Sequence, residues 1–528
     1  MKLLLTICVS FTLRLAATFA AEPLDVDVLL KGGTLFDGSG APGVAGDVAI
    51  KGDKIVGVGT FAVRYAGRTI DCTGLYIAPG FVDLHSHSDN LMADPIYRAS
   101  VNYVIQGCTT QVTGNCGGGP IRVGEFYEKI DKGGAGTNVA HLLPQGALRD
   151  HVIGNIDRKA TPEEIANMRE LADQAMRDGA WGMSTGLIYV PSVYADTAEI
   201  VAIAQVVAQH GGIYASHIRG EGTELLTAVN EALQIGREAG LPAHISHFKA
   251  SGQEAWGTLR AAANLVEQAR SNGQKATADQ YPYIASSTSL EATIVPTWAR
   301  SGGSKEFRKR LEDPEQGPRL KEAIRQSIEK KRDGAAIMIA RYRPRPEWNG
   351  KTLKEIADAE QKPPLDAALE IFQEGGAAIV NFSMHEDDVR MAMQLPWVAT
   401  ASDGGSKLPN EDKPHPRSYG TFARKIGHYA LREKVITVEH AVRASSALPA
   451  EILGMTDRGR LAVGQFADVV VFDPKTYIDT ATFAEPHQYS AGTKYVFVNG
   501  HPAVHDGVPT GVLAGRALRH PSSVAQGQ

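Results

Sequence analysis

Two histidines one residue apart, His85 and His87, follow a short apolar run and are candidates to bind a metal ion. The run, residues 80–84, reads Gly-Phe-Val-Asp-Leu and has the composition of a β-strand that ends at the histidines. Side chains of a strand alternate between its two faces, so residues two positions apart point the same way. Two imidazoles on one side of a strand end are a starting point for a divalent metal site, although the pair alone also fits two polar residues leaving a strand.

Four more side chains of types that bind zinc follow other strand-like runs of the chain. They are Cys116, His217, His247 and Asp403. Each alone has a simpler interpretation, such as a small buried cysteine or a carboxylate in a turn. His244 is excluded because it is three residues from His247 and therefore faces the other side of its strand. All six remaining candidates lie at strand ends, and imidazole, thiolate and carboxylate together predict a zinc site.

Apolar β-like runs alternate with amphipathic helical stretches from about Gly80 to Leu448. The later β-like runs are residues 109–113, 211–216, 242–246, 276–281, 376–382 and 397–402. The helical stretches include residues 162–176, 223–239 and 256–272, and Thr161 is a suitable N-cap for the first. Repeated βα units imply a parallel sheet, and this many favour an α/β fold with a (β/α)8 TIM-like barrel. Functional residues of such a barrel lie at the carboxyl ends of its strands, where the six candidates are expected.

Short strands separated by Gly and Asp turns occur near both ends of the chain. They are residues 26–30, 47–50 and 55–58 at one end and 464–472 and 495–500 at the other. We therefore expect both termini to build one small β-sandwich, from residues 21–79 and 449–528, beside a barrel of residues 80–448. A charged helical block at about residues 288–349 interrupts the βα alternation, and we interpret it as an inserted segment resembling a lid.

The first twenty residues have the features of a secretory signal peptide. A basic start is followed by an apolar core, residues 3–11, and by small residues up to Ala20, with Arg14 interrupting the apolar part. The run is too short to span a bilayer comfortably, and no other stretch is apolar for long enough. We expect cleavage after Ala20 and an exported protein, periplasmic or secreted, that has no membrane attachment afterwards.

The composition of the 528 residues suits a soluble globular enzyme, with 43% hydrophobic and 21% charged residues. A net charge of -5 gives no indication of a nucleic-acid partner. Of the four cysteines, Cys8 would leave with the signal, and Cys72, Cys108 and Cys116 would remain. An exported protein stabilised by disulfides would have more cysteines, and in pairs. We expect a large core to provide the stability and at least one cysteine to be free for chemistry.

Seven short motifs indicate a family. They are Gly-Phe-Val-Asp-Leu-His-Ser-His-Ser-Asp (80–89), Gly-Asn-Cys-Gly (114–117), Ser-His-Ile-Arg-Gly-Glu-Gly (216–222), Ile-Ser-His-Phe-Lys (245–249), Tyr-Pro-Tyr-Ile-Ala-Ser-Ser-Thr (281–288), Ser-Asp-Gly (402–404) and His-Pro-Arg (415–417). With them the chain resembles the amidohydrolase superfamily and, within it, the D-aminoacylase (N-acyl-D-amino-acid deacylase) family. The resemblance covers nearly the whole mature chain, and residues 459–470 are typical of the superfamily's β-sandwich.

The resemblance implies roles for residues at the matched positions. One set would hold a tightly bound zinc ion: Cys116, His217 and His247. A second set would form an adjoining, weaker metal position that Cys116 can bridge: His85, His87 and Asp403. A third set would bind the substrate's carboxylate and carbonyl: Lys249, Tyr281, Ser287 and Arg417. The segment between Asp403 and Arg417 is longer than the family pattern.

The implied reaction is hydrolysis of a small N-acyl-D-amino acid to a carboxylate and a free D-amino acid. Zinc lowers the pKa of water toward about 7 and polarises the scissile carbonyl. Asp403 would be the general base, and Arg417 offers a bidentate fit to the substrate carboxylate. Two alternatives stay open: another amidase of the superfamily, such as a dihydropyrimidinase-like hydrolase or a dipeptidase that releases a D-residue, and a non-catalytic metal-binding barrel. An intact Asp403 argues against the latter.

Overall fold

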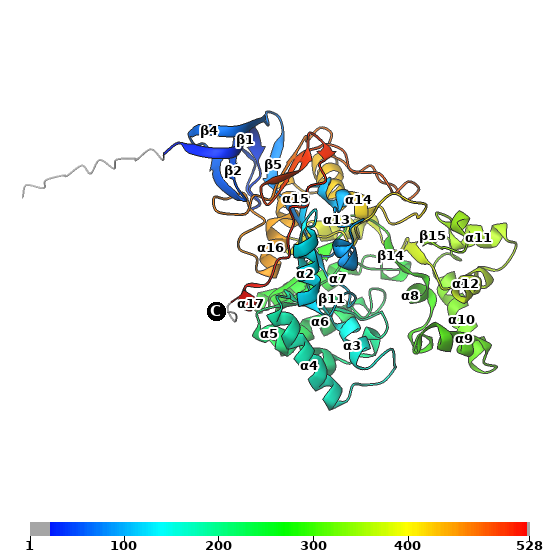
Figure 1. Cartoon of the computed structure of the whole chain (residues 1–528). Helices are drawn as coiled ribbons and strands as arrows, with labels where there is room; N and C mark the ends of the chain where they lie inside the picture. Colours follow the sequence, from blue (N-terminus) through cyan, green and yellow to red (C-terminus); the bar gives the residue numbers. More distant parts are fainter. Residues whose placement is uncertain (1–21, 525–528) are drawn as a thin grey trace, which may run out of the picture.

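The computed structural model describes residues 22–524, which form a barrel, a β domain and an inserted unit (Figure 1). The predicted signal peptide, residues 1–20, lies outside the described residues. Across residues 22–524, no helix combines the length and the hydropathy that crossing a bilayer requires. Cys72, Cys108 and Cys116 are buried free thiols.

Eight parallel strands form the predicted barrel. In ring order they are β6 (Phe81–Asp83), β7 (Cys108–Thr113), β8 (Asn138–His141) continuing as β9 (Leu143–Pro144), β10 (Gly182–Gly186), β11 (Ile213–His217), β12 (Ala243–Ile245), β13 (Ala276–Gln280) and β17 (Val398–Thr400). A bridge between Ser86 and Gly404 closes the ring from the last strand to the first. The carboxyl ends of all eight strands therefore open on one face.

Helices cover the outside of the barrel. The longer ones are α2 (Val123–Gly133), α3 (Gln145–Val152), α4 (Pro162–Arg177), α5 (Thr197–Gln209), α6 (Leu225–Ala239), α7 (Leu259–Ser271), α13 (Glu386–Met393) and α15 (Val438–Ser445). The shorter ones are α1 (Val101–Val104), α14 (Arg417–Ala423), α16 (Ala447–Leu453) and α17 (Pro521–Val524), and a π-helical segment covers Arg424–Arg432. Helix α4 begins at the predicted N-cap: the Thr161 hydroxyl accepts from the Glu164 N–H, and the Glu164 carboxylate accepts from the Thr161 N–H.

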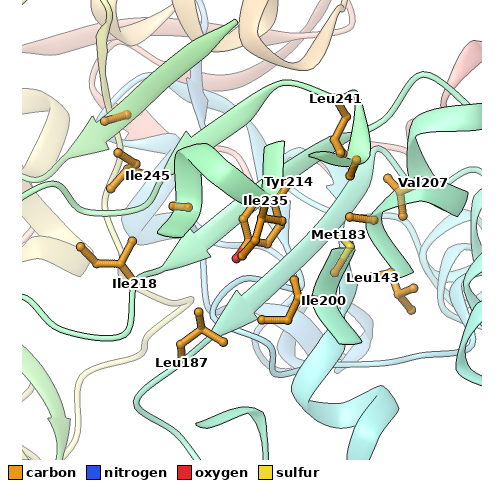
Figure 2. Close-up of a cluster of buried hydrophobic side chains, with 14 of the residues drawn as sticks. Leu143, Met183, Leu187, Ile200, Val207, Tyr214, Ile218, Ile235, Leu241 and Ile245 are labelled. Carbon is orange, nitrogen blue, oxygen red and sulfur yellow. The ribbon is translucent and has the colours of Figure 1, made fainter. Parts of the chain in front are cut away.

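A large apolar cluster fixes strands β9–β12 against helices α5 and α6 (Figure 2). Figure 2 shows Met183 of β10 and Tyr214 of β11 facing Ile200 and Val207 of α5 and Ile235 of α6. All five side chains are fully buried. Complete burial of one apolar side chain of this size stabilises the fold by about 1.5–3 kcal/mol. The cluster therefore holds the strand ends, and whatever side chains follow them, in fixed relative positions.

Both ends of the chain contribute strands to one nine-stranded sheet. Its strands are β1 (Leu24–Leu35), β2 (Val44–Lys51), β3 (Lys54–Gly59), β4 (Val63–Asp71), β5 (Tyr76–Pro79), β18 (Val469–Phe472), β19 (Thr493–Val498), β20 (His501–His505) and β21 (Val508–Pro509). The two groups join where β5 pairs antiparallel with β18, with Ala78 opposite Val470. Only Gly80 separates β5 from β6, so this sheet leads directly into the first barrel strand.

The inserted unit lies to one side of the barrel, at the right of Figure 1. Its elements are β14 (Ser286–Ser289), α8 (Leu290–Ile294), α9 (Gly303–Glu312), α10 (Gln316–Glu329), β15 (Ile337–Arg341), α11 (Leu353–Ala359), α12 (Pro364–Gln373) and β16 (Ala378–Asn381). One apolar cluster runs from Leu290 to Ile379. The prediction of a barrel strand at residues 376–382 is wrong: β16 forms there but pairs antiparallel with β14 and β15. Its apolar composition suits burial in either sheet, so composition alone does not identify its partners.

Candidate metal centre

The six predicted metal ligands meet at the carboxyl face of the barrel. Within residues 22–524 their donor atoms form three overlapping groups, each within 4.8 Å: His85, His87 and Cys116; Cys116, His217 and His247; and His85, His247 and Asp403. Each ligand ends a barrel strand or lies in the loop directly after one. All are buried except His87, whose side chain is 38% exposed. We call these six residues the metal centre.

The Cys116 sulfur lies at the middle of the metal centre. It is 3.2 Å from His85 Nε2 and 3.7 Å from both His217 Nδ1 and His247 Nε2. The His217 Nδ1 and His247 Nε2 atoms are 2.9 Å apart. Bond lengths to zinc place two tetrahedral ligand atoms about 3.3–3.6 Å from each other. The thiol and the two imidazoles therefore fit around one zinc ion with small adjustments.

Asp403 completes a second donor set on the other side of Cys116. Its Oδ1 atom lies 3.0 Å from His87 Nε2 and 3.5 Å from His85 Nε2. Cys116 is near both sets, because it groups with His85 and His87 as well as with His217. The geometry therefore suits two adjacent metal positions that share the sulfur.

Three of these residues have a left-handed backbone conformation, with φ of 51° at Cys116, 38° at His247 and 49° at Asp403. Only a few per cent of residues other than glycine adopt positive φ. The conformation costs about 1–3 kcal/mol per residue, and such residues cluster at active sites and ligand sites. Its occurrence at three predicted ligands supports a functional role for the metal centre.

Gly114 allows the turn that presents Cys116. Its φ is +77°, and a Cβ atom there would lie 2.0 Å from the Leu142 carbonyl oxygen. The Asn115 side-chain amide donates to the carbonyls of Leu84 at 3.1 Å and Val112 at 2.9 Å. These contacts tie the turn after β7 to the end of β6, so Cys116 is held close to the two histidines that follow β6.

The local charges favour the metal-binding forms of two ligands. Burial raises the pKa of the Cys116 thiol, but His85 and the hydrogen bonds of His217 and His247 outweigh burial and hold it well below its usual value. The thiolate is the form of cysteine that binds metals. Burial also raises the pKa of Asp403, but Arg417 and His85 outweigh it and hold that pKa well below the usual range. The shifts therefore favour the thiolate of Cys116 and keep Asp403 anionic at neutral pH.

Two carboxylates that the sequence does not single out, the half-buried Glu221 and the buried Asp279, orient the histidines from behind. Glu221 Oε1 lies 3.0 Å from His247 Nδ1 and 2.6 Å from Lys249 Nζ. Asp279 Oδ2 lies 3.4 Å from His85 Nδ1, and its Oδ1 accepts from the His247 N–H at 2.6 Å. Carboxylates in this position fix the ring orientation of metal-binding imidazoles. Both residues follow the strand-end pattern of the ligands, near the ends of β11 and β13, and this pattern is the signal that could have found them.

Arg417 lies beside Asp403 even though a long segment joins them. Its NH1 atom is 2.7 Å from Asp403 Oδ2, and its guanidinium carbon lies 4.6 Å from the centre of the Tyr281 ring. The Tyr281 hydroxyl is buried and has no hydrogen-bond partner among residues 22–524. Burial raises the pKa of Tyr281 well above its usual value, so its hydroxyl stays protonated and can donate to a substrate oxygen.

The other two predicted substrate residues already have hydrogen bonds. The Lys249 ammonium donates to Glu221 and lies 2.7 Å from His247 Nδ1, so it is placed behind the metal centre. The Ser287 hydroxyl donates to the Ile379 carbonyl at 2.9 Å, while its own carbonyl accepts from the Arg417 guanidinium at 3.4 Å. Ser287 is therefore next to Arg417, whereas Lys249 contacts the ligand His247.

Two pockets flank the metal centre, and His87 lines both. The first, of about 220 Å³, is lined by Asp403, Arg417, Ser287, Arg341 and Lys407 among others, and we call it the cationic pocket. The second, of about 700 Å³, is lined by Cys116, Gly117, Gly118 and Gly119 among others, and we call it the glycine-lined pocket. A substrate whose scissile bond lies at the metal centre would therefore extend into both pockets, with one part of the molecule in each.

Comparison with known proteins agrees with this arrangement. The model of the amidohydrolase family matches residues 68–288 and 348–504, and the stretch between them lies in the inserted unit. A D-aminoacylase from Alcaligenes xylosoxydans xylosoxydans is 37% identical over 515 residues, which cover 93% of this chain and 97% of the relative.

Two solved structures share the fold over nearly their whole length. One is a structure of a D-aminoacylase with a binuclear metal centre. It superposes on this chain with a TM-score of 0.81 and 33% sequence identity, and the match covers 94% of this chain and all of the D-aminoacylase. The other is an N-acyl-D-glutamate deacylase from Bordetella bronchiseptica with zinc and a phosphonate inhibitor, with a TM-score of 0.80, 32% identity and the same coverage. The predicted barrel with its accessory β domain is confirmed. The chain belongs to the amidohydrolase family and, within it, to the D-aminoacylase family.

Proposed function

We propose that this protein uses zinc to hydrolyse the amide bond of N-acyl-D-amino acids, releasing a carboxylate and a free D-amino acid. The observation that carries the proposal is the cluster of Cys116, His217 and His247 with Asp403 and Arg417 beside it. A thiolate and two imidazoles suit zinc, and a neighbouring carboxylate and guanidinium suit proton transfer and a substrate with a carboxylate. The related D-aminoacylase and N-acyl-D-glutamate deacylase support this substrate class.

The donor atoms suggest where zinc would bind. Cys116, His217 and His247 would hold one ion tightly, and His85, His87 and Asp403 would provide an adjoining weaker position. When bound, zinc supplies Lewis acidity, which lowers the pKa of water and polarises a carbonyl. Glu221, behind His247, and Asp279, behind His85, would keep the imidazoles in the binding orientation.

Asp403 would transfer the proton. Its carboxylate is anionic at neutral pH, and its two oxygens face His87 and Arg417 respectively. It would accept a proton from the attacking water and donate it to the nitrogen of the leaving amine. The ion pair with Arg417 keeps the carboxylate pointing into the pocket where this nitrogen would lie.

Arg417, Tyr281 and Ser287 would position the substrate. The guanidinium of Arg417 can pair with the α-carboxylate in a bidentate arrangement. The buried Tyr281 hydroxyl, which lacks a partner among the described residues, can donate to a carboxylate or carbonyl oxygen. Fixing the carboxylate and the amide carbonyl together leaves one orientation at Cα for the side chain, which would select one enantiomer. Lys249 would act on His247 rather than on the substrate.

We also propose that the protein is exported. Only the signal-like composition of residues 1–20 supports this, with its basic start, apolar core and small residues before Ala21.

The experiment that tests the function is hydrolysis of matched enantiomers by the zinc-loaded protein. Free amino acid should be released from N-acetyl-D-leucine and N-acetyl-D-glutamate and hardly from the L-forms. A dihydropyrimidine and a dipeptide with a D-residue test the alternative amidases. Turnover of either in place of the N-acetyl-D-amino acids would contradict the proposal. No turnover of any amide by protein that holds zinc would favour a non-catalytic barrel.

A further inference from the structure

The cationic pocket contains more positive charge than a single carboxylate requires. Arg341, Lys407 and Arg417 all line it. Arg417 is paired with Asp403 at 2.7 Å. Across residues 22–524, no carboxylate lies within 4.0 Å of the Lys407 ammonium or of the Arg341 guanidinium. Asp412, the other carboxylate of this pocket, is also beyond that distance. Among the described residues, Arg341 and Lys407 are therefore not in an ion pair.

Lys407 is held in the pocket by the loop that follows β17. Its backbone N–H donates to Asn102 Oδ1 at 3.2 Å. Its side chain passes Gly405, since a Cβ atom built on that glycine would lie 3.9 Å from the Lys407 Cε atom. The side chain is half-buried. Burial lowers the pKa of Lys407, Arg341 and Arg417 lower it further, and Asp412 opposes them. The three cations are thus close enough to repel one another.

Arg341 reaches the same pocket from the inserted unit. It is the exposed last residue of β15, where it pairs with Ala378 of β16, another residue of the pocket wall. Cations from two separate parts of the fold therefore meet beside Asp403. Like charges brought together without a counter-ion destabilise a fold, and an anionic ligand removes that cost.

The glycine-lined pocket on the other side of the metal centre has the opposite charge. Its wall includes the carboxylates of Asp89 and Asp150 and no lysine or arginine. An amide that spans the metal centre would therefore place its anionic part in the cationic pocket and its neutral part in the glycine-lined pocket. For an N-acyl amino acid, the anionic part is the amino acid and the neutral part is the acyl group.

We propose that the cationic pocket binds a second carboxylate, carried by the amino-acid side chain, so that the preferred substrates are N-acyl derivatives of D-aspartate and D-glutamate. This inference rests on the proposed function and refines it. Arg417 pairs with the α-carboxylate, and Lys407 and Arg341 pair with the side-chain carboxylate. Hydrogen bonds between charged partners are shorter and stronger than neutral ones. A neutral side chain leaves both cations without an ion-pair partner.

The first test uses the zinc-loaded native protein and substrates of nearly equal shape. N-acetyl-D-glutamate should have a kcat/KM at least about tenfold above that of N-acetyl-D-glutamine, as expected for a charged hydrogen bond. N-succinyl-D-leucine, which has its second carboxylate on the acyl group, should not exceed N-acetyl-D-leucine. Equal rates for the glutamate and glutamine derivatives would overturn the inference while the proposed function stands. A preference for the succinyl compound would place the second carboxylate on the acyl side and also overturn it.

The second test removes the two cations singly. Lys407→Met and Arg341→Met should lower kcat/KM for N-acetyl-D-glutamate about tenfold and change that for N-acetyl-D-glutamine by less than about twofold. Arg343→Met is the matched control, because Arg343 is exposed, two residues along the same segment, and outside the pocket wall. An equal loss on both substrates would make these residues structural and overturn their assignment. Failure of native protein to hydrolyse any N-acyl-D-amino acid would overturn the proposed function and this inference with it.

Discussion

The carboxylate of Asp403 and the guanidinium of Arg417 form a buried ion pair, with Oδ2 and NH1 2.7 Å apart. The residue proposed to move the proton thus contacts the residue proposed to bind the substrate carboxylate. Burial raises the pKa of Asp403, and Arg417 is the neighbour that lowers it most. A substrate carboxylate that pairs with Arg417 shares its charge, so Asp403 becomes a stronger base when the correct substrate is bound.

The first prediction concerns Asp403. Asp403→Asn keeps the size of the side chain but removes the proton acceptor, so kcat for an N-acetyl-D-amino acid should fall by about 100-fold or more. The tightly held zinc should remain, because Cys116, His217 and His247 are unchanged. Steady-state kinetics together with metal analysis of the same preparation check both parts. Near-normal turnover would mean that another group activates the water.

The second prediction concerns the metal. Cys116→Ala removes the sulfur that both donor sets share, so the purified variant should lose the tightly bound zinc. Cys72→Ala is the control, because Cys72 is also a buried free thiol but packs in the β domain. Metal content per chain measured by mass spectrometry separates the two variants. Full retention of zinc by the Cys116 variant would remove this residue from the site.

The third prediction concerns Arg417. Arg417→Lys keeps a positive charge beside Asp403 but loses the planar fork. KM for an N-acetyl-D-amino acid should rise, and kcat/KM should fall by the equivalent of about 1.5–3 kcal/mol. An N-acyl amine without a carboxylate should be a poor substrate of both forms, with little difference between them. An equal loss on that amine would show that Arg417 is structural.

The fourth prediction concerns stability and pH at the start of α4. Thr161→Ala removes the N-cap and should lower the free energy of unfolding by about 1 kcal/mol. Hydrogen bonds from Arg158 and Thr161 lower the pKa of Glu164 to about 2. Ionised Glu164 therefore stabilises the fold above its unfolded pKa of 4.5, and this contribution is lost as the pH falls from 4.5 toward 2.

Urea unfolding of the native protein and of the Glu164→Gln variant at several pH values checks this direction of the pH dependence. The native protein should be more stable at pH 7, and the difference should shrink below pH 4.5. Glu170→Gln is the control, since Glu170 is exposed in the middle of the same helix. A difference that stays constant or grows on acidification would contradict the assignment.

The fifth prediction concerns export. The mature protein should begin near Ala21 and lie outside the cytoplasm. Mass spectrometry of the native protein from cell fractions checks this, and an intact segment from Met1 to Ala20 in the cytosolic fraction would be incompatible with it.

The metal centre could be predicted because each ligand follows a recognisable strand. Strand β10 shows why the fold was harder to predict: its sequence, Gly-Met-Ser-Thr-Gly, contains no apolar run. Its polar side chains are buried and hydrogen bonded instead. The Ser184 hydroxyl donates to the Gly114 carbonyl, and the Thr185 hydroxyl bonds with those of Tyr214 and Ser216. A strand stabilised in this way has no signature in hydrophobic periodicity.

The pairing partners of a strand depend on long-range packing and not on its own residues. Residues 376–382 have the composition of a buried strand, but only the three-dimensional arrangement places β16 between β14 and β15. The same holds for Arg341, whose position beside Asp403 depends on how the inserted unit packs. Residue types thus identified the ligands, whereas the cations that would select the substrate became visible only in the fold.

The pairing of β5 with β18 has a consequence for the order in which the chain can fold. Strand β5 is among the first parts to be synthesised, and its partner β18 is among the last. Until β18 arrives, β5 presents an unpaired edge, and long-range pairings of this kind form late. Because β5 leads through Gly80 into the strand that positions His85 and His87, the metal centre is attached to a sheet that closes only after β18 has been made. Chains that stop before β18 should therefore be inactive.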